Sequence, residues 1–167
     1  PNRKRRAMML YDTRTAPNPR RVRMYLAEKG LSVPTTQVNL VKQEHKTDAF
    51  RALNPNLQTP VLILEDGFAL SETIAICRYF EELHPTPPLF GAGARGKAVV
   101  EMWQRRVELG LLLAVQFVFR HTHPAMADLE KPQVREFADV YRPRVFSFLE
   151  TLDGELGRRA FVAGDAF

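Results

Sequence analysis

The first half of the chain alternates short apolar segments with stretches whose apolar residues recur every three or four positions. Short apolar runs bounded by turn residues predict strands, and the wider spacing predicts helices with one buried face. Strands are expected at residues 8–11, 35–40, 61–64 and 68–70, and helices at residues 20–29, 47–53 and 72–83. The order strand–helix–strand, then strand–strand–helix, predicts an α/β domain over residues 7–84.

The second half has the pattern of an all-helical domain. Prolines and glycines predict a linker over residues 85–94. Residues 97–120 follow one long helical pattern. In its second half, apolar side chains are expected on almost every face of the helix, which predicts that this half is buried. Another helix is expected from Pro132, with a kink at Pro143. The helical domain is assigned to residues 95–167.

Charge and cysteine content narrow the class of protein. The chain has 24 Lys and Arg against 19 Asp and Glu, and residues 3–6 are all basic. Because the rest is near charge balance, nucleic acid is not an expected partner. The single cysteine, Cys77, excludes an internal disulfide framework and fits a reducing compartment. The longest apolar run is too short to span a bilayer and no secretory signal precedes Ala7, so a soluble, cytoplasmic protein is expected.

Pro60 opens the third predicted strand, which is an unusual place for proline. Proline has no N–H to donate to a sheet ladder, so here it belongs to an edge, a bulge or a cis turn. A trans proline at an edge is the commoner arrangement, whereas a cis Thr59–Pro60 bond would turn the Val61 backbone toward an extended peptide. Further on, Ser71 is expected to cap a helix, with Glu72 in the first turn, where a carboxylate suits the helix dipole.

Four segments of the chain occur together, in the same order and at the same spacing, in one known family. They are residues 10–12 with 17–23, residues 54–62, residues 70–76 and residues 161–165. In them the chain resembles the cytosolic glutathione S-transferases, especially the bacterial and fungal branch. The resemblance implies a thioredoxin-like glutathione-binding first domain, an all-α second domain and a homodimer. It also implies a further capping box and helix, so the second domain is expected to be incomplete at residue 167.

The resemblance assigns residues to the two ends of glutathione. Ser71 and Glu72 are implied to hold the carboxylate and the amine of the γ-glutamyl group, although both also suit an ordinary helix cap. After Thr59 and Pro60, the Val61 backbone is implied to pair with the cysteinyl part of glutathione.

Three more residues lie where members of the family contact the glycyl carboxylate. They are His45, Lys46 and Gln58. Lys46 offers a cation and Gln58 an amide donor, which both suit a carboxylate. Each of the three also fits a plain surface loop.

Two routes remain open for activating the glutathione sulfur. A thiol with a pKa of about 8.5 is mostly protonated at neutral pH, so an enzyme must favour the thiolate. Thr15 and Asn18 stand near the serine position of the family, at the start of the first helix. Alternatively, His121 or His123 could hold a water against the sulfur, as is thought for some members of the branch, although a histidine also suits a helix end. No metal site is expected, and Cys77 is predicted to be buried and inert.

The leading interpretation is a glutathione transferase that joins the glutathione thiolate to small hydrophobic electrophiles. One alternative is isomerisation, dehalogenation or ether cleavage with glutathione on the same scaffold. Another is a non-catalytic module of the same fold, used for protein assembly. The enzymes are expected to bind glutathione as the thiolate at neutral pH, and the module is not.

Overall fold

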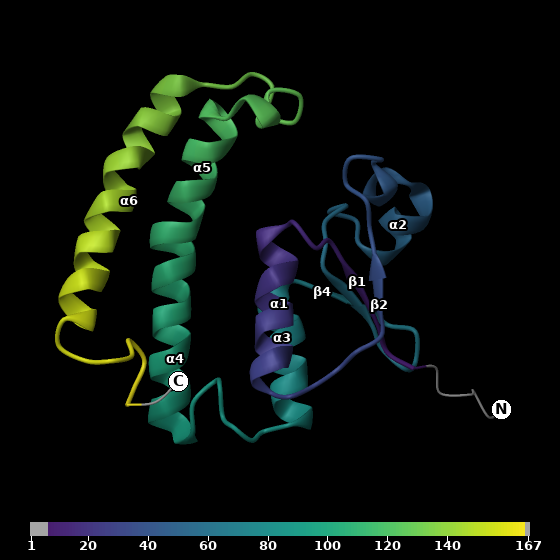
Figure 1. Ribbon diagram of the computed structural model, residues 1–167, viewed down its shortest axis with the longest axis horizontal. Helices are drawn as coiled ribbons and strands as arrows, with labels where there is room; N and C mark the ends of the chain where they lie inside the picture. Colours follow the sequence, from purple (N-terminus) through teal and green to yellow (C-terminus); the bar gives the residue numbers. More distant parts are fainter. Residues whose placement is uncertain (1–6, 166–167) are drawn as a thin grey trace. The chain divides into compact units, whose positions relative to one another are not determined.

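The computed structural model describes residues 7–165 of the chain (Figure 1). The chain divides into two compact units, residues 1–89 and residues 90–167. Each unit is described by itself. Within the described residues, no helix is long and apolar enough to cross a membrane.

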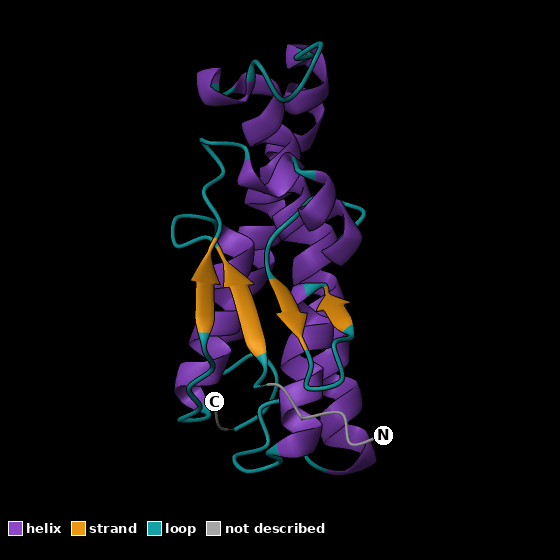
Figure 2. Cartoon of the chain, turned by 90° about the vertical axis from the view of Figure 1, so that its right-hand side faces the viewer, coloured by secondary structure: helices purple, strands orange, loops and turns teal. Residues whose placement is uncertain are grey.

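The first unit is built on a four-stranded mixed sheet. Its elements are β1 (Met9–Asp12), α1 (Pro17–Glu28), β2 (Thr35–Gln37), a 3₁₀ turn (Glu44–Lys46), α2 (Asp48–Leu53), β3 (Val61–Ile63), β4 (Ala69–Ser71) and α3 (Thr73–Leu83). The strand order is β2-β1-β3-β4, with β1 and β2 parallel and the other pairs antiparallel. Helices α1 and α3 lie side by side behind the strands (Figures 1 and 2). This is the thioredoxin-like fold that was predicted.

The core of the first unit follows from the apolar spacing of its elements. Val22 and Leu26 are buried on α1, and Ile76 and Phe80 on α3. Val61 and its neighbour in β3 are completely buried, as expected for the central part of a sheet covered on its faces.

A buried lysine joins α1 to the segment that follows α3. The Lys29 side chain has no exposed surface, and its Nζ lies 2.6 Å from Glu81 Oε2. Lys29 Nζ also donates to the carbonyl oxygen of His84 at 2.8 Å and to that of Pro87. Tyr25 donates its hydroxyl to Glu81, and burial together with this hydrogen bond raises the pKa of Tyr25 above its ordinary range. A buried charge needs such partners, because desolvation without them is costly.

Two predicted element boundaries in the first half are wrong. Strand β2 ends at Gln37: one further bond to β1 follows, from the Val38 N–H to the Asp12 carbonyl oxygen, and a turn begins at Leu40. Helix α1 begins at Pro17, where the fixed φ of proline suits the first helical position.

The predicted helix cap at Ser71 is also wrong. Ser71 is the last residue of β4, opposite Val61, and the N-cap of α3 is Glu72. Pairing in the sheet keeps Ser71 extended, so the change of direction falls on Glu72, which has φ 71° and ψ 122°.

The second unit contains a long helical rod and a second helix that packs along it. Its elements are α4 (Gly93–Arg106), a π-helical segment (Val107–Leu112), α5 (Leu113–Thr122), a 3₁₀ turn (Pro124–Met126) and α6 (Arg135–Leu156). Phe117 of α5 packs edge-to-face against Phe137 and Tyr141 of α6. Helix α6 continues through Pro143.

The prediction that the second half of the rod is buried all round is wrong. Leu109 is 60% exposed and Phe119 is 43% exposed. In this unit α6 is the helix that packs against α5, and it covers one side. An apolar face of α5 therefore stays open within the described part of the unit.

Candidate functional site

Two loops of the first unit meet at a pair of threonines. Thr59, which precedes β3, donates its hydroxyl to the Thr13 hydroxyl oxygen at 3.0 Å. Thr13, which follows β1, donates to the Val38 carbonyl oxygen at 3.0 Å. Both threonines are buried. The peptide bond between Thr59 and Pro60 is cis, as predicted. The start of α1 and the proline loop are thus held together by side-chain hydrogen bonds.

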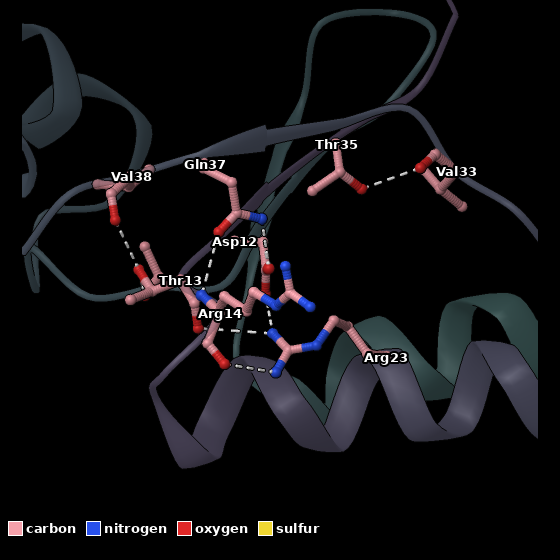
Figure 3. A network of polar contacts seen from close by, with 9 residues as sticks. Asp12, Thr13, Arg14, Arg23, Val33, Thr35, Gln37 and Val38 are labelled. Atoms are coloured by element: carbon pink, nitrogen blue, oxygen red, sulfur yellow. Dashed lines mark hydrogen bonds and ion pairs between the residues drawn. The ribbon is translucent and has the colours of Figure 1, made fainter.

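A buried carboxylate organises the loop between β1 and α1 (Figure 3). Asp12 is 1% exposed, and it accepts hydrogen bonds from Arg23 Nη1 at 2.5 Å and from Gln37 Nε2 at 2.6 Å. Arg23 Nη2 also donates to the Arg14 carbonyl oxygen at 2.9 Å. The Arg14 N–H donates to Gln37 Oε1 at 3.0 Å. These bonds fix the backbone on either side of Thr13.

The first turn of α1 has few free donors. Its N-cap, Ala16, has no side chain that can cap, and its N–H donates to the Thr13 carbonyl oxygen. Pro17 and Pro19 have no backbone N–H. Among the first three helical residues, the backbone N–H therefore comes from Asn18. A helix start normally favours an anion through several free N–H groups. Here that contribution is reduced.

Thr15 and Asn18, the predicted sulfur-activating residues of the first unit, lie together at this helix start. Thr15 is exposed and lines a surface groove of about 490 Å³ along the beginning of α1. Asn18 is half-buried in the first turn. The Thr15 hydroxyl and the side-chain amide of Asn18 are both groups that can donate to an anionic sulfur.

The residues predicted to hold the γ-glutamyl group lie where β4 meets α3. Glu72 is exposed, and its positive φ is uncommon for a residue other than glycine. Strained backbone of this kind is concentrated at binding sites. Arg21 Nη1 donates to the Thr73 hydroxyl oxygen at 2.8 Å, which ties α1 to the first residue of α3. The half-buried Ser71 precedes them at the end of the sheet.

Val61 is placed differently from expectation. It pairs in register with Tyr11 on one side and with Ser71 on the other. Whichever way its N–H and C=O point, they face a strand of the sheet. The outward-facing backbone expected at Val61 is therefore not found. Thr59 lies before Pro60 and outside the paired residues of β3.

His45, Lys46 and Gln58 lie on either side of α2. His45 and Lys46 belong to the 3₁₀ turn before α2, and Gln58 lies in the loop after it. The Gln58 backbone carbonyl oxygen accepts from Asn54 Nδ2 at 2.8 Å, which fixes the backbone of Gln58. The side-chain amide of Gln58 is exposed and takes no part in this bond. Burial, and to a lesser degree the Lys46 charge, lower the pKa of His45. Within the described residues, the buried Nδ1 of His45 has no hydrogen-bond partner.

His121 and His123 belong to the second unit, where both rings bind backbone. His121 Nδ1 accepts from the Val134 N–H at 3.1 Å, and its ring packs edge-to-face on Phe137. His123 Nδ1 accepts from the Ala125 N–H at 3.2 Å and caps the 3₁₀ turn. In the neutral ring, the remaining nitrogen of each histidine carries the proton and can donate.

Sequence reasoning missed the residues that hold the loop. Asp12, Arg23 and Gln37 are far apart in sequence, and their contacts depend on β2 pairing beside β1. A carboxylate directly after a buried strand was the available signal, since buried carboxylates need a partner. Cys77 is 2% exposed, and burial raises the pKa of its thiol to about 12.

Comparison with known proteins shows which family the chain is similar to. Residues 15–83 match the family described as glutathione S-transferase, N-terminal domain. Glutathione S-transferase 2 of Saccharomyces cerevisiae is 39% identical over 163 residues, which cover 96% of this chain and 70% of that protein. The maleylacetoacetate isomerase of Pseudomonas aeruginosa is 38% identical over 87 residues, which cover 51% of this chain and 41% of that protein.

Solved structures of related proteins have the same fold. A glutathione S-transferase domain-containing protein of Marinobacter aquaeolei superposes with a TM-score of 0.89 at 37% identity, covering 95% of this chain and 79% of the other. Gtt2 of Saccharomyces cerevisiae gives a TM-score of 0.87 at 38% identity, covering 95% and 78%. The long match at 39% identity and the shared fold lead to one conclusion: the chain belongs to the glutathione S-transferase family of enzymes, with similar members in bacteria and fungi.

Proposed function

We propose that the protein binds glutathione in its first unit and transfers it to small hydrophobic electrophiles. The observation that carries this proposal is the hydrogen bond between Thr59 and Thr13 at 3.0 Å, which brings the start of α1 beside the loop of cis-Pro60. A ligand extended between these loops has its thiol near the helix start. Membership of the glutathione S-transferase family supports the choice of ligand.

In this proposal the γ-glutamyl end of glutathione lies at the start of α3. The Ser71 hydroxyl and free N–H groups of the helix bind its carboxylate, and the exposed Glu72 carboxylate binds its amine. The backbone that pairs with the cysteinyl part is assigned to Thr59, because both sides of Val61 are occupied by strands.

The glycyl carboxylate of glutathione is assigned to the residues around α2. Lys46 supplies a positive charge and the exposed Gln58 amide a donor. His45 supplies a neutral N–H donor near pH 7, because its pKa is lowered by burial and by Lys46.

The chemical step is an attack by the bound thiolate on an electrophilic carbon. The thiol loses its proton to solvent, the sulfur forms a bond to carbon, and the leaving group departs with the bonding electron pair. The Thr15 hydroxyl and the Asn18 side-chain amide are assigned to donate to the sulfur and lower its pKa. The alternative assignment is a water held by His121 or His123.

Thiolate titration tests the function and the assignment together. Ultraviolet absorbance of bound glutathione against pH gives the pKa of the bound thiol, which should lie below the free value of about 8.5. Thr15→Ala and Asn18→Ala should raise this pKa if the helix start activates the sulfur. If His121→Ala or His123→Ala raises it instead, the water route is correct. An unshifted thiol in the unsubstituted protein contradicts the enzyme and favours a non-catalytic module.

Glu72→Ala tests the glutathione site itself. Removing the partner of the ligand amine should weaken glutathione binding by roughly tenfold. Glu82→Ala, an exposed carboxylate on the same helix, is the matched control and should leave affinity unchanged. Calorimetric titration with glutathione measures both, and equal affinities for the two variants would rule out this site.

A second candidate function is glutathione-dependent isomerisation. It is favoured by the 38% identity to a maleylacetoacetate isomerase over 87 residues. Isomerisation consumes no glutathione, whereas conjugation consumes one per turnover, so loss of free thiol distinguishes the two.

We also propose a cytoplasmic homodimer, on the grounds of the family; sedimentation of the purified protein tests the dimer.

A further inference from the structure

The groove beside Thr15 has a distinct chemical lining. Its walls are Arg14, Thr15, Ala16, Pro17, Arg20, Arg21 and Met24. Three of the seven residues are arginines, and none is acidic. The first turn of α1 likewise contains no acidic residue. A concave surface with one sign of charge concentrates the field and attracts ions of the opposite sign.

Two of the three arginines are not committed to another part of the protein. Arg21 donates to the Thr73 hydroxyl. By contrast, within residues 7–165 no carboxylate forms an ion pair with the side chain of Arg14 or Arg20. The Arg14 backbone is fixed on both sides by Gln37 and Arg23, so the origin of its side chain is held in place (Figure 3).

The rest of the groove is apolar. Met24 is 55% exposed, which is a large apolar surface for a methionine, and Ala16 and Pro17 continue it toward the helix start. A methionine side chain adapts to ligands of different shape. The groove thus combines apolar lining residues with guanidinium groups that have no carboxylate partner among the described residues, and it is also lined by Thr15, to which the sulfur of glutathione is assigned.

We propose that this groove binds an electrophile that carries an anionic substituent, such as a carboxylate on an aromatic or alkyl body. The inference rests on the proposed function, because it places the reacting carbon next to the glutathione sulfur. Arg14 and Arg20 bind the anion, since guanidinium groups match carboxylates in geometry as well as in charge. Met24 and Pro17 cover the apolar body.

A matched pair of electrophiles tests the proposal. Chlorodinitrobenzene is neutral, and chlorodinitrobenzoate carries a carboxylate on the same ring. In both, the thiolate attacks the carbon that bears chlorine, the C–S bond forms, the C–Cl bond breaks and chloride leaves with the electron pair. The measured quantity is kcat/KM for the benzoate divided by kcat/KM for the neutral compound, so that a general loss of activity cancels.

The variants are Arg14→Gln/Arg20→Gln, Arg20→Lys and the control Arg142→Gln, an exposed arginine on α6. The double variant should lower the ratio at least about tenfold, because two charge-assisted contacts are lost. Arg20→Lys should keep most of the ratio, since it keeps the charge. Arg142→Gln should keep it within about twofold, as expected for an exposed charge that does not line the groove. Added salt should lower the ratio in the unsubstituted protein.

Each other outcome overturns the inference in a recognisable way. An unchanged ratio in the double variant means that the arginines do not bind the electrophile. An equal rise in the KM for glutathione with both electrophiles means that they bind glutathione instead. Conversion of a dimer to a monomer in sedimentation means that they contact a second subunit. If the unsubstituted protein conjugates neither compound and does not bind glutathione, the proposed function itself fails.

Discussion

Thr59 donates its hydroxyl to Thr13 at 3.0 Å, and this bond joins the two loops on which the proposed glutathione site depends. Thr13 in turn donates to the Val38 carbonyl oxygen at 3.0 Å. The chain of bonds has a direction, so the two threonines are not equivalent. The Thr13 hydroxyl both donates and accepts a hydrogen bond, whereas the Thr59 hydroxyl donates one.

Replacing these threonines by valine should therefore have unequal effects. Thr13→Val leaves the Thr59 hydroxyl and the Val38 carbonyl without their partner in a buried place, at a cost of about 2 to 3 kcal/mol. Thr59→Val removes one donor and should cost about 1 kcal/mol. Urea unfolding of both variants measures the difference. Equal losses would show that the bonds do not form this chain in solution.

Arg23 should be important for stability through Asp12. The Asp12 side chain is 1% exposed, against 32% for Arg23. Arg23→Leu leaves the buried carboxylate without its cation and should cost about 3 kcal/mol. Arg23→Leu/Asp12→Asn removes the stranded charge and should recover part of that loss. A double variant as unstable as the single one would contradict this explanation.

Glu72 is expected to lower the stability of the fold through its backbone while its carboxylate contributes to glutathione binding. With φ 71°, its backbone is strained for any residue that has a side chain and relaxed for glycine. Glu72→Gly and Glu72→Ala lose the same carboxylate, so both should weaken glutathione binding to a similar extent. Thermal unfolding should find the glycine variant more stable than the alanine variant by about 1 kcal/mol. The reverse order would mean that the backbone at this position is not strained.

Cys77 should resist thiol reagents in the folded protein. With a pKa of about 12, raised by burial, the thiolate fraction at pH 8 is about one in ten thousand. Because the folded pKa exceeds the unfolded value of 9.0, this group's contribution to stability is present below pH 9 and is lost as the pH rises toward 12. Ellman's reagent should react slowly with the native protein and at once in guanidinium. Rapid reaction with the native protein would show that the thiol is accessible.

Gly110 and Gly154 should respond to alanine in opposite ways. A Cβ at Gly110 would lie 2.7 Å from two ring carbons of Phe148, whereas a Cβ at Gly154 would meet nothing within 4 Å. Gly110→Ala should cost about 1 to 3 kcal/mol through overpacking. Gly154→Ala, inside α6, should gain up to about 1 kcal/mol from helix propensity. Gly110→Ala/Phe148→Leu should recover most of the loss, and a failure to do so would contradict the clash.

The sequence predicted what depends on local pattern and missed what depends on pairing between distant segments. The helix expected from Thr47 has that residue as its N-cap, and threonine is a common helix cap: its side chain accepts from the Phe50 N–H. Ser71 was expected to cap α3 by the same reasoning, but pairing with Val61 keeps it in β4. Cap propensity cannot show which of two adjacent residues a sheet holds extended.

The candidate site divides in the same way. Thr59, Pro60 and Glu72 could be proposed from spacing and resemblance, because they lie close to turn and helix signals. Asp12 and Gln37 could not, because their contact depends on the register of β1 with β2. The exposed side of α5 was missed for another reason: an apolar pattern shows that a face needs covering, but it does not show what covers it.

Lys29 also defines where a shortened form of the first unit can end. Its ammonium group binds the carbonyl oxygens of His84 and Pro87 in addition to Glu81. A proteolytic or recombinant fragment that stopped at Leu83 would lose both carbonyls and leave a buried cation with too few partners. The smallest fragment that folds independently should therefore extend past Pro87.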